Sequence, residues 1–144
     1  MNKGKYLAID FGDKRVGIAL SDYNKEIAFP RDFLEYSSEK NLITQLKQIC
    51  QEEDVIKIIL GLPIQMDGTF GERAKKTQKF FDQLKKAIPS MSIDFFDERL
   101  STEFAVKSLR GQGIKSKDQK GKRDAMSAQI ILQNYLVSLN SSDT

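Results

Sequence analysis

Three acidic residues stand out because each lies where an unpaired carboxylate would be costly. Asp10 interrupts the apolar run Tyr6–Phe11, and Glu98 ends a second apolar segment, Met91–Glu98. Asp124 lies at the start of a C-terminal helical pattern, on its apolar face. Burying a carboxylate in an apolar element costs free energy unless the group is paired or holds a cation. Ion pairing and metal binding are therefore the two kinds of chemistry to weigh for these acids.

The composition narrows the kinds of metal site and catalytic site that are open to the chain. It has no histidine and a single cysteine, Cys50, among its 144 residues. A Ser-His-Asp triad, a Cys-His pair, histidine-containing zinc sites and thiolate cages are therefore excluded. Metal chemistry would depend on oxygen ligands, which select hard cations such as Mg²⁺ or Mn²⁺.

Positive charge is concentrated in one segment. The chain has a formal net charge of +3, but residues 107–123 alone carry +6 and the remainder −3. This concentration favours a polyanionic partner, with a solvated surface as the alternative. No aromatic residue alternates with the charges, so recognition of backbone and shape is expected rather than base stacking. The basic residues are Lys107, Arg110, Lys115, Lys117, Lys120, Lys122 and Arg123.

The first acid lies in a predicted β-hairpin. Tyr6–Phe11 and Val16–Leu20 are both apolar runs of strand length, and Gly12-Asp13 between them suits a tight turn. Glycine can adopt φ > 0 at the first central position of such a turn, so Gly12 is expected to do so. A third strand is expected over Ile27–Phe33, and Pro30 indicates that it lies at the edge of the sheet.

Helices and strands are predicted to alternate in the rest of the chain. The spacing of apolar residues predicts a helix over Glu39–Glu53, and Val55–Leu60 reads as a central strand covered on both faces. Thr69 and Glu72 fit a capping box that would start a second helix, which Pro89 would end. On that second helix the expected buried residues are Ala74, Thr77, Phe81, Leu84 and Ile88.

The C-terminal third follows the predicted strand that ends at Glu98. A helix is expected over Ser101–Leu109, a mobile loop over Gly111–Gly121 and a last helix over about Lys122–Leu139. The whole pattern predicts one α/β domain over residues 1–139 with a polar tail at 140–144, built on a mixed sheet with helices on both faces. The apolar segment near the N-terminus is too short for a signal peptide, so the cytoplasm is the expected location.

This order of elements could bring the three acids together. If the first and last strands are parallel, Asp10 and Glu98 end at the same edge of the sheet, where open α/β sheets bind ligands. Carboxylates ~4 Å apart would repel by ~4 kcal/mol per pair at an effective dielectric of ~20. A divalent cation bound between them would make the electrostatic energy of the cluster favourable. The alternative is three separate acids: Asp10 in a turn, Glu98 paired with Arg99, and Asp124 at a helix start.

Four sequence blocks resemble the YqgF family of the ribonuclease-H-like superfamily. They are LAIDFGDKRVGIALSD (7–22), GLPIQMDGTFGERA (61–74), DERLSTEFA (97–105) and DAMSAQIIL (124–132), in the family order and spread over nearly the whole chain. The family usually has Ala-Ala where this chain has Ser127-Ala128, a change that leaves the acids in place. Its members are described as candidate Holliday junction resolvases and as nucleases that mature the precursor of small-subunit ribosomal RNA.

The resemblance implies a ribonuclease-H-like fold with a five-stranded mixed sheet and a two-metal-ion phosphodiesterase. Its catalytic and metal-binding acids would be Asp10, bridging two Mg²⁺ or Mn²⁺ ions, with Glu98 and Asp124 each holding one. Water on one ion would attack phosphorus while the other ion stabilises the leaving 3′-oxygen. The predicted substrate contacts are Lys14, Arg15, Arg99, Ser101, Thr102, Lys115, Lys117, Lys122 and Arg123.

Three functions follow from this reading. The first is a nuclease that processes the 5′ end of precursor 16S ribosomal RNA, acting as a monomer or weak homodimer, with RNA favoured over DNA. The second is a resolvase of four-way DNA junctions. The third is a nucleic-acid-binding module without turnover. An actin-like ATP-binding fragment is disfavoured because that fold needs a second similar domain.

Overall fold

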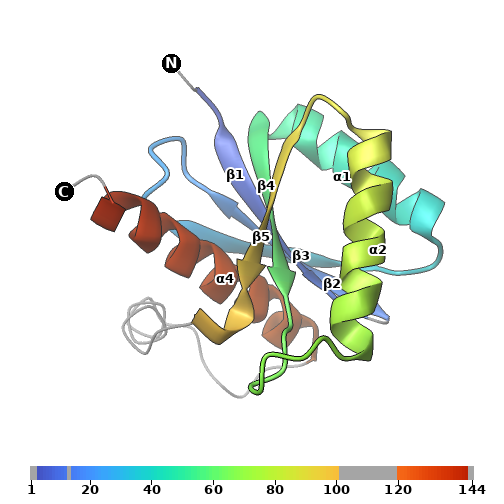
Figure 1. Ribbon diagram of the computed structural model, residues 1–144. Coiled ribbons are helices and arrows are strands. Elements are labelled where there is room, and N and C mark those ends of the chain that lie inside the picture. The colour runs from blue at the N-terminus through green and yellow to red at the C-terminus, as the bar shows by residue number, and fades with distance from the viewer. Residues whose placement is uncertain (1–2, 13, 101–119, 143–144) are drawn as a thin grey trace.

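A computed structural model of the chain describes residues 3–12, 14–100 and 120–142, with the side chains of 120–126 and 140–142 left outside the description. Its centre is a five-stranded mixed sheet in the order β3-β2-β1-β4-β5, with helices on both faces (Figure 1). The fold class expected from the sequence is confirmed. The elements are β1 (Lys5–Phe11), β2 (Arg15–Ser21), β3 (Ala28–Glu35), α1 (Glu39–Glu52), β4 (Val55–Leu62), α2 (Glu72–Ala87), β5 (Ser92–Asp97), the short 3₁₀ helix η1 (Glu98–Leu100) and α4 (Lys120–Ser142).

The predicted hairpin forms, but its glycine has a different role from the one expected. β1 and β2 pair antiparallel, with Ile9 opposite Ile18 and Phe11 opposite Val16. Gly12 does not adopt a positive φ, so that expectation was wrong. A Cβ at Gly12 would instead collide with the carbonyl oxygen of Arg15. Glycine is needed there for close approach of two backbones rather than for a left-handed turn.

The three parallel strands place their carboxyl ends along one edge of the sheet. β4 lies between β1 and β5 and pairs parallel with both, with Ile9 beside Leu60 and Leu62 beside Asp97. β3 pairs antiparallel with β2 at the outer edge, where Pro30 was expected to place it. Asp10 and Glu98 are therefore carried to the same edge, as the sequence predicted.

Helices α1 and α2 cover one face of the sheet. Their buried residues, among them Leu42 and Leu46 of α1 and Phe80 and Leu84 of α2, pack against Leu7, Ile9, Ile58 and Leu60. The hydroxyl oxygen of Ser38 caps α1 by accepting from the amide of Asn41 at 3.1 Å. Cys50 is buried in this core, and burial raises its pKa to about 11, so it is a packing residue as expected.

Two details of α2 differ from the sequence predictions. The predicted capping box does not form: the N-cap is Gly71, and the Thr69 hydroxyl contacts Asp67 Oδ1 at 2.6 Å instead. Asp67 also accepts from the amide of Thr69 at 2.9 Å, so this threonine closes the preceding loop rather than the helix. Ala74, Thr77 and Leu84 are buried as expected, but Phe80 is fully buried while Phe81 and Ile88 are only partly so.

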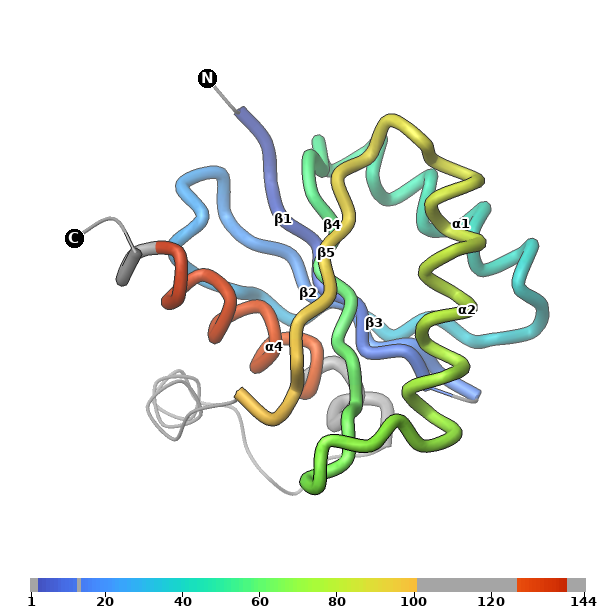
Figure 2. The backbone as a smooth tube through the Cα atoms, viewed as in Figure 1, coloured from blue at the N-terminus to red at the C-terminus, as the bar shows by residue number. Residues whose placement is uncertain are grey.

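Helix α4 covers the opposite face of the sheet (Figures 1 and 2). Ala128, Ile131, Leu132 and Leu136 pack there against Ala8, Ala19, Ala28, Ile59 and Phe96. The helix is also tied to β3, because Gln129 Nε2 donates to the carbonyl of Ala28 at 2.9 Å and Gln133 Oε1 accepts from its amide at 3.0 Å. It begins and ends a few residues beyond the predicted Lys122–Leu139. None of the described helices is long and apolar enough to cross a membrane.

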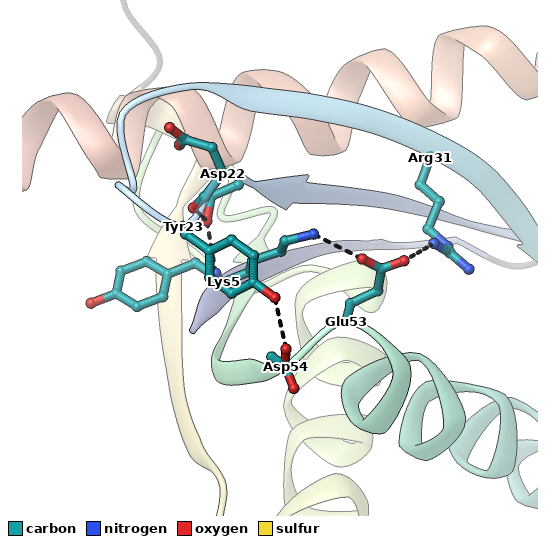
Figure 3. A network of polar contacts seen from close by, with 8 residues as sticks. Lys5, Asp22, Tyr23, Arg31, Glu53 and Asp54 are labelled. Carbon is teal, nitrogen blue, oxygen red and sulfur yellow. Dashed lines mark hydrogen bonds and ion pairs between the residues drawn. The ribbon is translucent and has the colours of Figure 1, made fainter. Parts of the chain in front are cut away.

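A polar network occupies the opposite edge of the sheet from the two acids, where β1 and β4 begin (Figure 3). Glu53 accepts from Lys5 Nζ at 2.9 Å and from Arg31 Nη1 at 3.0 Å. The hydroxyl of Tyr23 donates to Asp54 Oδ2 at 2.7 Å. Basic and acidic groups balance here, so this edge carries no concentrated charge for a polyanion.

Candidate active site

Asp10 lies within β1 rather than in a turn. Its backbone is opposite Gly17 of β2, and its side chain is half-buried. Side chains alternate between the faces of a sheet, so Asp10 shares the face of Ala8, which packs against α4. Asp10 is therefore a strand residue and not a turn residue, which is where the first separate-acid alternative put it.

Gly61 of β4 separates the strands that carry the two acids. Ile9 pairs with Leu60, so the next residues along these parallel strands, Asp10 and Gly61, are neighbours. A Cβ at Gly61 would lie 2.5 Å from Ile131 Cδ1 of α4 and 3.1 Å from Glu98 Oε2. The missing side chain leaves the space in which the Glu98 carboxylate approaches the backbone of β4.

Glu98 begins η1 immediately after β5, and its carboxylate is in an unusual environment. Oε2 is buried, and within the described part of the chain it has no hydrogen-bond partner. Burial raises the pKa of Glu98 to about 7, and the negative charges of Asp10 and, to a smaller extent, Asp97 act in the same direction. Arg73, at the start of α2, lowers this pKa by its positive charge. A buried acceptor beside a second carboxylate is unfavourable unless a cation or a proton compensates it.

Arg99 does not provide that compensation. It pairs with Asp97 instead, with Nη2 at 2.7 Å and Nε at 3.1 Å from Oδ2, and its amide donates to Oδ1 at 2.9 Å. The second separate-acid alternative, a Glu98–Arg99 pair, is thus wrong. The two adjacent carboxylates thus make different contacts. Asp97 pairs with Arg99, whereas Glu98 lies against Gly61 and has one oxygen without a hydrogen bond among the described residues.

Of the remaining predicted site residues, only two others have described side chains. Lys14 is exposed, and its carbonyl accepts from the amide of Tyr36 at 2.9 Å. The Arg15 guanidinium lies over the ring of Phe33, 5.1 Å from its centroid. Ser101, Thr102, Lys115 and Lys117 lie outside the described residues, as do the side chains of Asp124, Lys122 and Arg123, although α4 includes these last three in its backbone. Their roles stay predictions.

Sequence reasoning did not assign a role to Gly61 or Arg73. Both lie in the block GLPIQMDGTFGERA, between the elements that carry the acids. The glycine that ends a run of β-branched residues was a usable signal, because a glycine in a strand marks close approach of another group. Nothing local marked Arg73, whose proximity to Glu98 arises from the packing of α2 beside β4.

The described residues fit a divalent cation, though incompletely. Two carboxylates converge, one of them with a buried oxygen that no hydrogen bond satisfies, and oxygen donors are the ligands that Mg²⁺ and Mn²⁺ prefer. Among the residues whose side chains are placed, no group of three or more acidic, cysteine or histidine residues gathers. A third ligand would have to come from a side chain such as that of Asp124, which precedes Ala128 by one turn and Ile131 by two turns of α4.

Comparison with known families places this geometry in context. A family model described as "RuvX: Holliday junction resolvase" matches residues 4–138. A candidate pre-16S rRNA nuclease of Chloroflexus aurantiacus is 37% identical over 142 residues, covering 99% of this chain and 92% of that protein. A protein of the same name from Syntrophomonas wolfei is 39% identical over 132 residues, covering 92% and 93% of the two chains.

Among solved structures, RuvC of Thermus thermophilus in complex with a Holliday junction substrate resembles the chain. The TM-score is 0.60 at 11% sequence identity, over 94% of this chain and 96% of that one. At this identity the likeness concerns the fold alone.

Proposed function

The chain belongs to the RuvX (YqgF) family, as its motifs indicated, and we propose that it is a metal-dependent nuclease that processes the 5′ end of precursor 16S ribosomal RNA. The observation that carries this proposal is the buried Glu98 Oε2, which lies beside the charge of Asp10 and has no hydrogen-bond partner among the described residues. It supports a pocket that a bound cation would stabilise in place of the proton that Glu98 otherwise retains. The names of the similar proteins support the substrate.

Three residues would hold the cations: Asp10 from β1, Glu98 at the start of η1 and Asp124 from α4. When bound, two divalent ions would supply a water of lowered pKa on one side of the phosphorus and a Lewis acid for the leaving 3′-oxygen on the other. The protein contributes the position of the carboxylates. The β1–β4 pairing fixes Asp10, the space above Gly61 admits Glu98, and Ile131 packs α4 against the same glycine.

Basic residues around this edge would hold the substrate backbone. Arg73, beside Glu98, is placed to meet a phosphate next to the acids. Lys14 and Arg15 follow the β1 end, and Arg99 is oriented by Asp97. The side chains of Ser101, Thr102, Lys115, Lys117, Lys122 and Arg123 would extend the contact along the RNA. Binding carried by such charges weakens steeply with salt.

The experiment compares two substrates under three metal conditions. Purified protein is incubated with an RNA containing the 5′ precursor of 16S rRNA, or with a four-way DNA junction, each with Mn²⁺, Mg²⁺ or EDTA. We expect cleavage of the RNA that EDTA abolishes, and loss of cleavage in Asp10→Asn and Glu98→Gln with RNA affinity retained. Asp94→Asn is the matched control, because this acid of β5 pairs with Lys57 at 2.8 Å, away from the pocket.

The alternative outcomes separate the competing functions. Cleavage that persists in EDTA would contradict the metal mechanism. Cleavage of the junction but not of the RNA would favour the resolvase activity named in the family description. Binding of either substrate without turnover would leave a nucleic-acid-binding module.

A further inference from the structure

The exposed large apolar side chains of the described residues form two groups at opposite edges of the sheet. Tyr23 belongs to the polar network of Figure 3, the amide of Ile27 donates to Asp22 Oδ1 at 3.1 Å, and Phe29 lies on β3 two residues before Arg31. The second group, which we call the apolar rim, consists of Met66, Phe70 and Leu100, with exposed fractions of 87%, 39% and 62%. Exposed apolar side chains that gather beside a site call for an explanation more than scattered ones do.

The apolar rim lies next to the candidate active site. Leu100 is two residues after Glu98 in η1, so their Cα atoms are at most about 7 Å apart. The loop that carries Met66 approaches the same 3₁₀ helix, because a Cβ at Gly68 would lie 3.8 Å from Arg99 Nη1. Figures 1 and 2 show the β4–α2 loop and η1 at the same end of the molecule, at the bottom of the view.

The loop that carries Met66 is closed by backbone hydrogen bonds. The amide of Gly68 donates to the carbonyl of Gln65 at 2.8 Å, and the amide of Gln65 donates to the carbonyl of Thr69 at 3.0 Å. Gly68 has φ +88°, which only glycine adopts readily, and Asp67 accepts from the backbone of Thr69. Met66 therefore lies at the tip of a hydrogen-bonded turn, with its side chain exposed to solvent.

We propose that the apolar rim contacts the faces of unstacked nucleobases next to the scissile phosphate, so that the cleaved strand is single-stranded there. This inference rests on the proposed nuclease function. The neighbouring arginines can pair with phosphates and the acids can reach them through a bound cation, whereas three uncharged side chains gain nothing from phosphates. A base face is the apolar part of the same nucleotide, and it becomes available only when the base leaves its stack.

The test measures kcat/KM with Mn²⁺ on three forms of one RNA sequence: single-stranded, duplex, and single-stranded with abasic residues on both sides of the scissile phosphate. The variant combines Met66→Ser, Phe70→Ser and Leu100→Ser. Its control combines Ile27→Ser and Phe29→Ser, which remove exposed apolar side chains at the opposite edge. Circular dichroism and light scattering establish that each variant is folded and report its state of association.

We expect wild-type protein to prefer the single strand to the duplex. The rim variant should lose about fivefold or more in kcat/KM on the intact single strand, the loss of one stacking contact, and the control should lose nothing. On the abasic RNA the rim variant and wild type should be equal, because the contact is already absent. That equality distinguishes base contact from a merely structural effect.

Three results would overturn the inference. An unchanged kcat/KM of the rim variant on the single strand would do so while leaving the nuclease intact, and so would an equal loss on intact and abasic RNA. A change in self-association without a change in cleavage would assign the rim to a second copy of the chain. Absence of cleavage by wild type would instead reject the proposed nuclease function, and this inference with it.

Discussion

Gly61→Ala adds one methyl group where two parts of the site meet. The new Cβ would lie 2.5 Å from Ile131 Cδ1 and 3.1 Å from Glu98 Oε2. Carbon atoms pack at about 3.5–4.0 Å, so the overlap with Ile131 is at least about 1 Å, and overpacking of this size costs about 1–3 kcal/mol. We expect the free energy of unfolding to fall by that amount and nuclease activity to be lost.

A second substitution separates the two contacts. Ile131→Val removes Cδ1 and by itself costs about 0.5–1.5 kcal/mol. The double variant Gly61→Ala, Ile131→Val should therefore lose less stability than the sum of the losses in the two single variants. The contact with Glu98 remains, and its carboxylate must still shift by a few tenths of an ångström. Metal–ligand distances tolerate only about 0.2 Å, so the double variant should stay at least roughly tenfold less active than Ile131→Val.

Urea unfolding followed by circular dichroism gives the free energies, and Mn²⁺-dependent cleavage of the precursor RNA gives the activity. Wild-type stability in Gly61→Ala would contradict the expected cost of the overlap and would mean that the Ile131 side chain rotates away from the new methyl group. Recovery of full activity in the double variant would refute the placement of Glu98 against Gly61.

Three further predictions concern pH and stability. The pKa of Glu98 is raised from 4.5 to about 7 in the folded metal-free protein, so the folded state binds a proton that the unfolded state releases, and the free energy of unfolding should fall as pH rises from 4.5 to about 7. Asp10→Asn should flatten this pH dependence, measured by urea unfolding at each pH. An identical slope in both proteins would contradict the electrostatic coupling of Asp10 to Glu98. Gln133→Ala leaves the buried amide of Ala28 without its acceptor and should lower the free energy of unfolding in urea by about 1–3 kcal/mol, with cleavage unchanged. A cost near zero would contradict the contribution of this hydrogen bond between α4 and β3. Ser38→Ala removes the N-cap of α1 and should cost about 1 kcal/mol without changing cleavage, and equal midpoints of thermal unfolding would argue against the cap.

The elements of the fold were predictable because each has a strong local pattern. The near-continuous apolar run Val55–Leu60 is typical of a strand covered on both faces, and the stripe Leu42, Leu46 and Ile49 has the period of a helix. Thr69 shows where this reasoning fails. It fits a capping box by spacing, but Asp67 two residues earlier competes for its hydroxyl and amide, and the helix begins after Gly71 instead.

The part of the site that was predictable is the part that depends on the order of the strands in the sheet. Parallel strands bring Asp10 and Glu98 to one edge, so the order of elements sufficed for these two acids. Which acid Arg99 pairs with was not predictable, since Asp97 and Glu98 are adjacent and the choice depends on the direction of each side chain after β5. The role of Gly61 depends on Ile131, seventy residues away in sequence, and no local pattern contains that contact.

The central claim is that Asp10 and Glu98 provide two of the three carboxylates of a cation-binding site. Mn²⁺ titration of the isotope-labelled protein tests this claim most directly. Paramagnetic broadening of backbone amide signals reports where the ion binds, independently of any nuclease activity. We predict that the signals of Gly61 and of the residues next to Asp10 and Glu98 broaden first, and that Asp10→Asn or Glu98→Gln weakens this broadening. Broadening centred elsewhere, for example at Glu53 and Asp54, or broadening unchanged in both variants, would contradict the account.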